Sequence, residues 1–271
     1  MDSFETLLVT VADGVASVIL NRPEAMNSFN STMRSELVTL WAALRENDDV
    51  RCVLITGAGD RAFCTGIDRT EAMADIDPDS DKLDGYITPF MFDDPGSAMC
   101  PKANELWKPV VVAVNGIACG GAFYLLGEAD VIIASDTATF FDPHVTYGMT
   151  AAFEPIQLLG RMAFSDLVRM SLMGASERLS AQTAMASGLV SEVTAPELLM
   201  PTAARIATTI AEAPALATQG TLRSLWMGRE LSRRQALDQA YLMTALGTDK
   251  ASLAEGQERF SSGARMEWRL R

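Results

Sequence analysis

A pair of adjacent glycines, Gly120 and Gly121, occupies a position in the sequence that is suited to stabilising negative charge. A continuous apolar, β-branched run at residues 110–114 precedes the pair and predicts a strand buried on both faces, followed by an Asn-Gly turn. An apolar run from Ala122 then begins a helix. Because glycine has no Cβ, the backbone here can come close to a ligand. The unpaired N–H of Gly121 at the helix start could donate to an oxygen that gains negative charge, which is half of an oxyanion hole.

An earlier strand-to-loop passage would supply the other half of the oxyanion hole. A β-branched run at residues 53–56 ends in a glycine, and the segment Arg61-Ala62-Phe63-Cys64-Thr65-Gly66-Ile67-Asp68 follows it. In this order and at this spacing, the two passages resemble the enoyl-CoA hydratase/isomerase (crotonase) superfamily, and further matches cover nearly the whole chain. The resemblance implies that the N–H groups of Ile67 and Gly121 form the hole. It also implies an acyl-CoA thioester substrate, whose enolate oxygen these groups stabilise. The alternative is a pair of tight turns in an α/β domain.

The resemblance implies an α/β fold with two regions. Residues 1–195 would form a crotonase-like ββα spiral core that holds the acyl-CoA and oxyanion-hole site, and residues 196–271 a C-terminal helical trimerisation region. The alternation of strand, helix and strand before residue 57 independently predicts a parallel sheet. Beyond Pro196, three amphipathic stretches carry more apolar surface than an isolated appendage can bury: 198–213, 215–227 and 232–246. We therefore expect a homotrimer or a dimer of trimers, the assembly that the family forms.

Two parts of the chain resemble segments that bind coenzyme A in this family. The passage Asn21-Arg22-Pro23-Glu24-Ala25-Met26 is similar to the segment along the nucleotide end, although Ser28 replaces the usual alanine. In the last helix, Phe260 matches an aromatic residue that reaches a neighbour's adenine, but Gly263 stands where a lysine is expected. Arg265 is then the substitute for that lysine, and plain packing of the helix is the alternative. With Phe260 and Arg265, the resemblance assigns substrate or coenzyme binding to Arg22, Glu24, Met26, Ala62, Thr65, Gly66, Asp68 and Gly120.

The acid and base residues depart from the hydratase pattern. Hydratases of this family carry one glutamate on the helix after the glycine pair and a second glutamate in a later Pro-Glu dipeptide. Counting from Gly121 places the first on Tyr124, and aligning Pro143 places the second on His144. Both carboxylates are therefore absent, which predicts that the protein is not an efficient hydratase.

The residues near these positions offer other acid and base groups. His144 is the only histidine in the chain, and a histidine can act as base or acid near neutral pH, although it could equally be a hydrogen-bonding bystander. Asp142 could orient it or merely form a turn. Glu154 follows in the segment that skirts the pocket in this family, where a carboxylate could be the partner of His144. Tyr124 could donate a proton, line the pocket or simply pack. Glu128 lies about 6 Å of helix rise beyond Tyr124, which favours a structural role.

Three functions stay open at this level. The first is an acyl-CoA lyase or isomerase of the superfamily that forms an enolate in the oxyanion hole, since isomerisation, decarboxylation, thioester hydrolysis and carbon–carbon cleavage all use such a hole. The second is a retro-Claisen type carbon–carbon hydrolase, because a Pro-His dipeptide with an acidic residue further on resembles that branch. The third is a non-catalytic acyl-CoA-binding homologue.

The composition excludes several other classes of function. A net charge of −13 argues against binding nucleic acid or an anionic membrane, since both favour a basic face. Four cysteines without Cys-x-x-Cys spacing and a single histidine provide no plausible metal site, so we expect buried, reduced thiols and no cofactor beyond the coenzyme A of the substrate. The absence of a leader pattern or a long apolar run predicts a cytoplasmic protein.

An acidic, helix-poor segment interrupts the pattern between residues 75 and 101. It contains several aspartates and prolines and predicts a long mobile loop. The resemblance places this loop over the acyl pocket as a lid, and the alternative is a solvated insertion without a role.

Overall fold

The computed structural model describes residues 3–74, 86–88, 91–92, 94–263 and 268–270, and its main sheet has the strand order β1-β2-β3-β7-β9-β12. Neighbouring strands are parallel except for the hairpin of β1 and β2, so the predicted parallel sheet is confirmed. The hairpin turns at Asp13 and Gly14, whose φ angles of 50° and 77° suit an Asp-Gly turn. The strands are β1 (Leu7–Ala12), β2 (Val15–Leu20), β3 (Cys52–Gly57), β7 (Val110–Val114), β9 (Val131–Ser135) and β12 (Glu192–Thr194).

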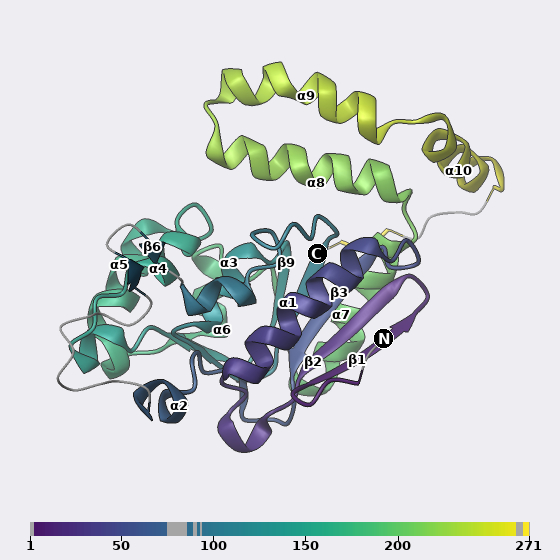
Figure 1. Ribbon diagram of the computed structural model, residues 1–271. Helices are drawn as coiled ribbons and strands as arrows, with labels where there is room; N and C mark the ends of the chain where they lie inside the picture. The colour runs from purple at the N-terminus through teal and green to yellow at the C-terminus, as the bar shows by residue number, and fades with distance from the viewer. Residues whose placement is uncertain (1–2, 75–85, 89–90, 93, 264–267, 271) are drawn as a thin grey trace.

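Helices cover both faces of this sheet (Figure 1). α1 (Ser31–Glu46) begins at Asn30, whose side chain accepts a hydrogen bond from the Met33 N–H, and lies on one face. α7 (Pro196–Ala211) packs on the other face through small and apolar side chains such as Leu199 and Ala203. The predicted core residues of α1 are all buried: Met33, Leu37, Leu40, Trp41 and Leu44.

The position of β7 in the sheet explains its uninterrupted apolar sequence. Val110, Val112 and Val114 point into the core under α1, whereas Val111 and Ala113 point into the core under α7. A strand buried on both faces has no polar side, as predicted. The predicted region boundary after residue 195 falls directly before α7, which completes the second of these cores.

A second sheet, which the sequence does not predict, has the order β11-β10-β8-β4. Strands of two or three residues are too short to show an alternating pattern, so their formation depends on tertiary pairing. The polypeptide leaves β4, β8 and β10 directly into the turns that carry the predicted site residues. The strands are β4 (Ala62–Cys64), β8 (Ile117–Cys119), β10 (Thr139–Phe141) and β11 (Leu179–Ser180).

Short helices lie between the strands of the two sheets along the chain. The α-helices are α2 (Arg69–Ala74), α3 (Ala122–Glu128), α4 (Phe153–Leu158), α5 (Phe164–Met173) and α6 (Ala181–Ala186). The 3-10 helices are η1 (Pro23–Ala25), η2 (Pro95–Met99), η3 (His144–Tyr147) and η4 (Gly174–Ser176). β5 (Tyr86–Thr88) and β6 (Met91–Phe92) form a small antiparallel pair.

The prediction of a mobile loop between residues 75 and 101 is wrong for the last part of that segment. Residues 75–85, 89–90 and 93 lie outside the described residues, but from Asp94 onward the backbone is integrated into the core. Ala98 and Met99 of η2 are buried, and the indole Nε1 of Trp41 donates to the Ala98 carbonyl at 2.9 Å. The cause is long-range packing against α1, which a local pattern of aspartate and proline does not reveal.

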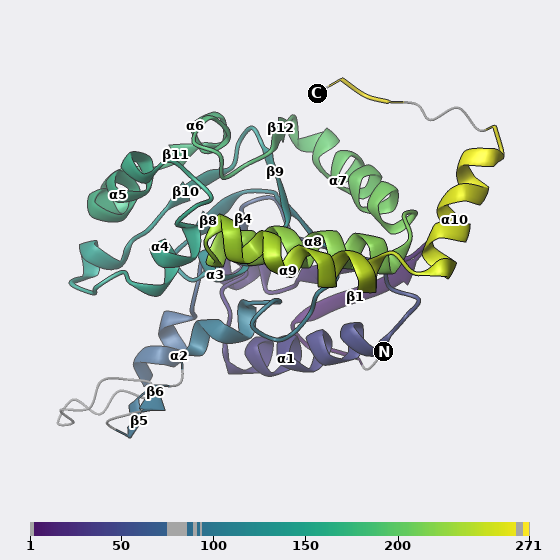
Figure 2. The same cartoon turned by 90° about the horizontal axis from the view of Figure 1, so that it is seen from above.

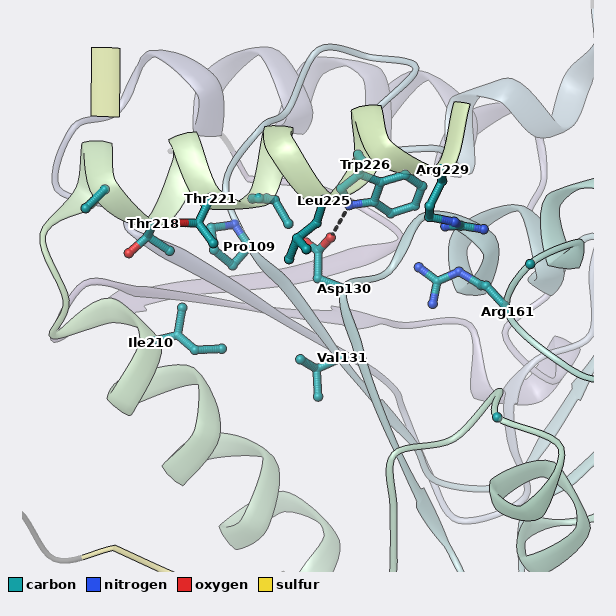
Figure 3. Close-up of a pocket in the computed structure, with 14 residues that line it drawn as sticks. Pro109, Asp130, Val131, Arg161, Ile210, Thr218, Thr221, Leu225, Trp226 and Arg229 are labelled. Atoms are coloured by element: carbon teal, nitrogen blue, oxygen red, sulfur yellow. Dashed lines mark hydrogen bonds between the residues drawn. The ribbon is translucent and has the colours of Figure 1, made fainter. Parts of the chain in front are cut away.

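The C-terminal helices extend beyond the body of the molecule, as Figures 1 and 2 show. α8 (Ala215–Glu230) and α9 (Arg233–Gly247) lie side by side, and α10 (Lys250–Ser261) follows, so the predicted helical region is confirmed. A Cβ on Gly220 would lie 3.2 Å from the Cα of Gly247, so two glycines permit this close helix contact. Trp226 of α8 donates to Asp130 of the core at 2.7 Å (Figure 3). Within the described part of the chain, no helix combines the length and apolarity needed to cross a membrane.

Candidate active site

The two predicted halves of the oxyanion hole meet in the structure. β4 and β8 are parallel neighbours, so the turns after them, at Gly66 and at Gly120-Gly121, leave the same edge of the second sheet. A Cβ on Gly66 would lie 2.7 Å from the backbone nitrogen of Gly121, and the φ angle of Gly66 is +84°. Both the space and the backbone conformation therefore require glycine at position 66.

The N–H of Ile67 is turned toward the same place by backbone pairing. Ile67 forms a parallel bridge with Phe29, in which the Phe29 N–H donates to the Gly66 carbonyl and the Asp68 N–H donates to the Phe29 carbonyl. Successive backbone groups of an extended segment point to opposite sides, so the N–H of Ile67 points away from Phe29. Among the described residues, no hydrogen bond uses the N–H of Ile67 or of Gly121. The two donors predicted from the sequence are thus free to bind an external oxygen.

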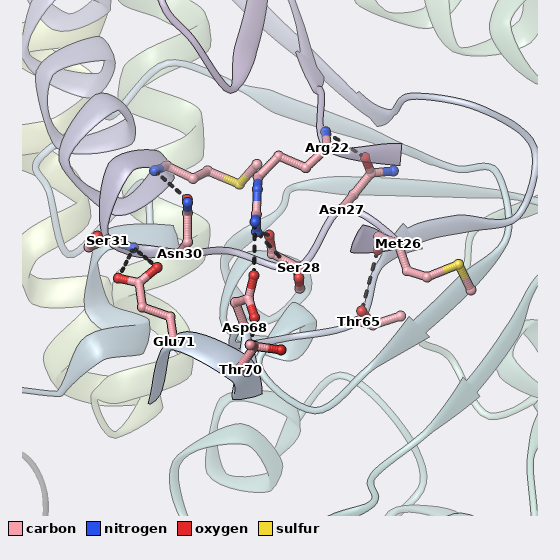
Figure 4. Close-up of polar contacts among 11 residues, drawn as sticks. Arg22, Met26, Asn27, Ser28, Asn30, Ser31, Thr65, Asp68, Thr70 and Glu71 are labelled. Atoms are coloured by element: carbon pink, nitrogen blue, oxygen red, sulfur yellow. Dashed lines mark hydrogen bonds and ion pairs between the residues drawn. The ribbon is translucent and has the colours of Figure 1, made fainter. Parts of the chain in front are cut away.

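A polar network fixes the loop that carries Ile67 (Figure 4). The Arg22 guanidinium donates to the Ser28 carbonyl at 2.7 Å and forms an ion pair with Asp68 at 2.8 Å. Burial raises the pKa of Asp68, but the hydrogen bonds from Arg22 and the Thr70 N–H outweigh it, and the net shift is downward. Arg22 and Asp68, both predicted to bind coenzyme, therefore position the oxyanion loop through each other.

His144 reaches this site from the neighbouring strand. Phe141 at the end of β10 pairs with Cys119 at the end of β8, so the residues after each strand are adjacent. A Cβ on Gly120 would lie 3.6 Å from Pro143 and 3.7 Å from the Cε1 of His144. The imidazole consequently lies against the glycine turn that presents the Gly121 N–H.

Two carboxylates flank the imidazole of His144. Asp142, with 0% of its surface exposed, binds Nδ1 at 2.5 Å and the His144 N–H at 3.2 Å, both through Oδ1. On the other side, Nε2 lies 3.5 Å from Oε1 of the buried Glu154. The Nδ1 contact with Asp142, at 2.5 Å, is much shorter than the 3.5 Å contact of Nε2 with Glu154, so we assign the proton of a neutral His144 to Nδ1 and the lone pair to Nε2.

The charges and burial in this cluster shift the pKa values of both His144 and Glu154. The hydrogen bond to Asp142 raises the pKa of His144, burial opposes that shift, and the charge of Glu154 adds to it. Burial raises the pKa of Glu154, while a positive His144 opposes the rise. The Oδ2 of Asp142 has no hydrogen-bond partner among the residues that the structure places, so a charged imidazole is its stabilising neighbour.

Comparisons with known proteins agree with this geometry. Residues 10–270 match the family described as enoyl-CoA hydratase/isomerase. The chain belongs to this family. It is 32% identical over 256 residues to the (E)-benzylidenesuccinyl-CoA hydratase of Thauera aromatica, covering 92% of this chain and 93% of that relative. It is 33% identical over 211 residues to the 1,2-epoxyphenylacetyl-CoA isomerase of Escherichia coli K12, covering 78% of each.

A solved structure of the family has the same fold over its whole length. An enoyl-CoA hydratase/isomerase from Mycobacterium paratuberculosis superposes with a TM-score of 0.83 at 33% sequence identity, covering 100% of both chains. The crotonase fold predicted from the sequence is therefore confirmed.

Tyr124, the residue that the sequence analysis assigned to the first hydratase glutamate position, is buried. Its hydroxyl donates to Oδ1 of Asp94 at 2.9 Å. Burial, followed by the charges of Glu154 and Asp94, raises the pKa of Tyr124 far above its usual value. The carboxylate of Glu128 instead accepts the N–H groups of Lys102 and Ala103, which gives it the structural role expected from the sequence.

The other residues assigned by family resemblance occupy different environments. Met26 and Thr65 contact each other through a 3.4 Å hydrogen bond from the Thr65 hydroxyl to the Met26 carbonyl (Figure 4). Glu24 is exposed on η1, whereas Ala62 is buried and its carbonyl already accepts from Asn27. The side chain of Phe260 and all of Arg265 lie outside the described residues.

Two cysteines lie beside the site without the properties of nucleophiles. Cys64 precedes the first turn and Cys119 the second, and burial raises the pKa of each thiol to about 12. Neither forms an appreciable amount of thiolate at neutral pH. All four cysteines are free and buried, as predicted.

Asp94 is the site residue that the sequence analysis missed. It lies in the segment assigned to a mobile loop, although its Asp-Pro-Gly sequence is a recognisable turn signal. Its side chain also accepts the Gly96 N–H at 3.0 Å. The turn signal at Asp94 is local in the sequence, but its contact with Tyr124 forms only through the tertiary fold.

Proposed function

We propose that the protein converts an acyl-CoA thioester through an enolate held by the N–H groups of Ile67 and Gly121, with His144 as the base. The observation that carries this proposal is the imidazole beside Gly120, oriented by Asp142 through Nδ1. An oriented base next to an oxyanion hole can remove the proton α to the carbonyl whose oxygen the hole stabilises.

Glu154 is proposed as the second proton-transfer group. It shares the cluster with His144, so the pair can hold one proton as carboxylic acid and imidazole or as carboxylate and imidazolium. A proton taken from one carbon by His144 can then be returned at another position by either partner. This arrangement favours isomerisation or another reaction of the enolate over hydration, for which hydratases of this family use two glutamates that Tyr124 and His144 replace in this proposal.

Hydration of crotonyl-CoA is therefore expected to be slow, at least about 10²-fold below a family hydratase that has both glutamates, because one positioned acid or base contributes that much or more. The loss of the enoyl absorbance measures the rate, with such a hydratase as the control. A comparable rate would show that Asp142 or Glu154 replaces the missing glutamates and that our division of roles is wrong.

A substrate panel tests the proposed function directly. The two relatives named above act on CoA thioesters with aromatic acyl groups by name, so aryl-substituted and aliphatic acyl-CoAs form the panel, together with free CoA. Conversion of an acyl-CoA, with exchange of its α-proton for deuterium in D₂O, is the expected result. Tight binding of acyl-CoAs without conversion or exchange would instead identify a non-catalytic binding protein.

A retro-Claisen hydrolase is the second candidate. The Asp142–His144 pair supports it, because a histidine oriented by an aspartate is suited to activating water for attack on a carbonyl. Cleavage of β-diketones without coenzyme A, and no exchange with acyl-CoAs, would favour this function.

We also propose a homotrimer or a dimer of trimers. α8 and α9 leave large apolar side chains in solvent, including Tyr241 at 82% exposure and Leu225 at 66%. A pocket of about 690 Å³ between α8 and the core adds further uncovered apolar surface at Val131, Ile210 and Trp226 (Figure 3). Sedimentation velocity at micromolar concentration should give three or six times the chain mass of 29.2 kDa. A stable monomer would contradict this assembly.

A further inference from the structure

The ring of Tyr124 is enclosed by a turn that leaves room for it. Only 5% of Tyr124 is exposed, and a Cβ on Gly96 would lie 2.3 Å from the ring carbons. Asp94, two residues before this glycine, accepts the Tyr124 hydroxyl. The turn therefore fits the ring and its hydroxyl together, and a side chain at position 96 would displace the ring.

The turn is fixed independently of Tyr124. The Ser97 hydroxyl donates to the Asp94 carbonyl at 2.8 Å, and the Asn104 amide donates to the Ser97 carbonyl at 2.9 Å. The buried indole of Trp41 binds the next residue, Ala98. The Asp94 carboxylate is thus a preformed acceptor, and Tyr124 adapts to it.

The direction of the hydrogen bond decides what Tyr124 offers to the site. Oδ1 of Asp94 accepts both from the phenol and from the Gly96 N–H, and an ionised carboxylate has no proton to give. The phenol proton is therefore committed to Asp94. What remains available on Tyr124 is the oxygen, as an acceptor.

Tyr124 and Glu154 lie on two helices that are in contact. A Cβ on Gly127 would lie 2.5 Å from the Cβ of Gln157, so α3 and α4 touch at these residues. Tyr124 precedes Gly127 by three residues on α3, and Glu154 precedes Gln157 by three residues on α4. The charges of Glu154 and Asp94 both act on Tyr124, and those of His144, Asp142 and Asp94 act on Glu154.

We infer that Asp94 is a positioning residue that acts through Tyr124: it holds the phenol proton, so that Tyr124 offers the site its oxygen as a hydrogen-bond acceptor and not its proton. The inference rests on the proposed function in so far as Tyr124 takes part in turnover. It gives Tyr124 the role of an acceptor, in place of the proton donation considered from the sequence.

A double-mutant cycle tests whether Asp94 acts through Tyr124. Asp94→Ala and Tyr124→Phe should each lower kcat about 10-fold with KM within about 3-fold, and the double variant should be no slower than Tyr124→Phe alone. Asp94→Asn should recover most of the activity, because its amide oxygen can accept the same two hydrogen bonds. Asp136→Ala is the matched control, because Asp136 is exposed and lies outside the Asp94 turn, and it should leave kcat unchanged. Multiplying effects of the two single variants, or an Asp94→Ala variant with normal kcat, would overturn the inference.

A spectroscopic measurement separates this inference from the proposed function. The chain has four tyrosines, so ¹³Cζ-tyrosine labelling with Tyr124→Phe as the reference assigns the Tyr124 resonance. In the parent protein, that resonance should show no ionisation up to pH of about 11, above the usual tyrosine pKa. In Asp94→Asn, which removes the negative charge, ionisation should begin at lower pH. An unchanged titration would refute the link to Asp94 even if no substrate is turned over, while a failed substrate panel alone leaves this result standing.

Discussion

Replacing His144 by alanine is expected to lower turnover of the acyl-CoA substrate by about 10²–10⁴-fold, the usual contribution of a positioned general base. Affinity for the thioester should stay within a few-fold, because binding is proposed to come from the coenzyme and from the two oxyanion N–H groups. Steady-state kinetics measure the first quantity, and isothermal titration calorimetry the second.

The pH dependence of the parent enzyme gives an independent check on His144. The hydrogen bond to Asp142 raises the pKa of this residue above the ordinary value of 6.5, with burial opposing and Glu154 adding to the shift. A base works in its neutral form, so turnover should rise with pH through a pKa on the alkaline side of 6.5 and fall below it. The residual activity of His144→Ala should lack this dependence.

Val145→Ala is the matched control for this experiment. Val145 is the next residue of η3, and its side chain lies toward Gly174, where a Cβ would approach it to 3.1 Å. Its replacement should leave kcat and the pH profile unchanged. Full activity of His144→Ala would make the histidine a bystander and pass the role of base to Glu154.

The sequence predicts those parts of the fold whose signal is local. The Asp13-Gly14 turn sets a two-residue hairpin, and the uninterrupted apolar run of β7 reflects burial on both faces. The strands β4, β8 and β10 carry no such signal, since each has three residues and exists only through pairing with the others. The two glycine turns were therefore recognisable, but the sheet that brings them together was not.

The candidate site shows the same difference between features with a local sequence signal and features that depend on tertiary packing. Glycine at position 66 is required by the close approach of the Gly121 backbone, and glycine at position 121 by the ring of Phe29, to which a Cβ would come within 2.7 Å; such requirements are visible in the sequence as glycines. The pairing of His144 with Asp142 was foreseeable from their spacing, whereas the contact of His144 with Glu154 depends on how η3 and α4 pack. Asp94 could not be linked to Tyr124, because the two residues meet only when η2 is anchored to Trp41 and α3 is in place.

Gly66→Ala is expected to lower kcat by at least about 10²–10³-fold, which is the usual contribution of one oxyanion donor. The new methyl group would occupy the place where the enolate oxygen is proposed to bind the Gly121 N–H. A Cβ at this position would lie 2.7 Å from the Gly121 nitrogen and 3.4 Å from its Cα. Both atoms belong to the backbone, so no side-chain rotation relieves the contact. The φ angle of +84° adds strain of about 1–3 kcal/mol, and the melting temperature should fall as well.

A loss of stability must be distinguished from a loss of the oxyanion hole. Gly228→Ala is the matched control, since a Cβ there would have no neighbour within 4 Å, and alanine in a helix interior should leave activity unchanged and stability equal or higher. The carbonyl stretching frequency of a bound acyl-CoA then reports on the hole itself. Two N–H donors polarise the thioester carbonyl and lower its frequency in the parent protein, and folded Gly66→Ala should show a frequency close to that of the free ligand. If folded Gly66→Ala kept both the lowered frequency and the parent kcat, the N–H groups of Ile67 and Gly121 would not be the groups that hold the enolate oxygen.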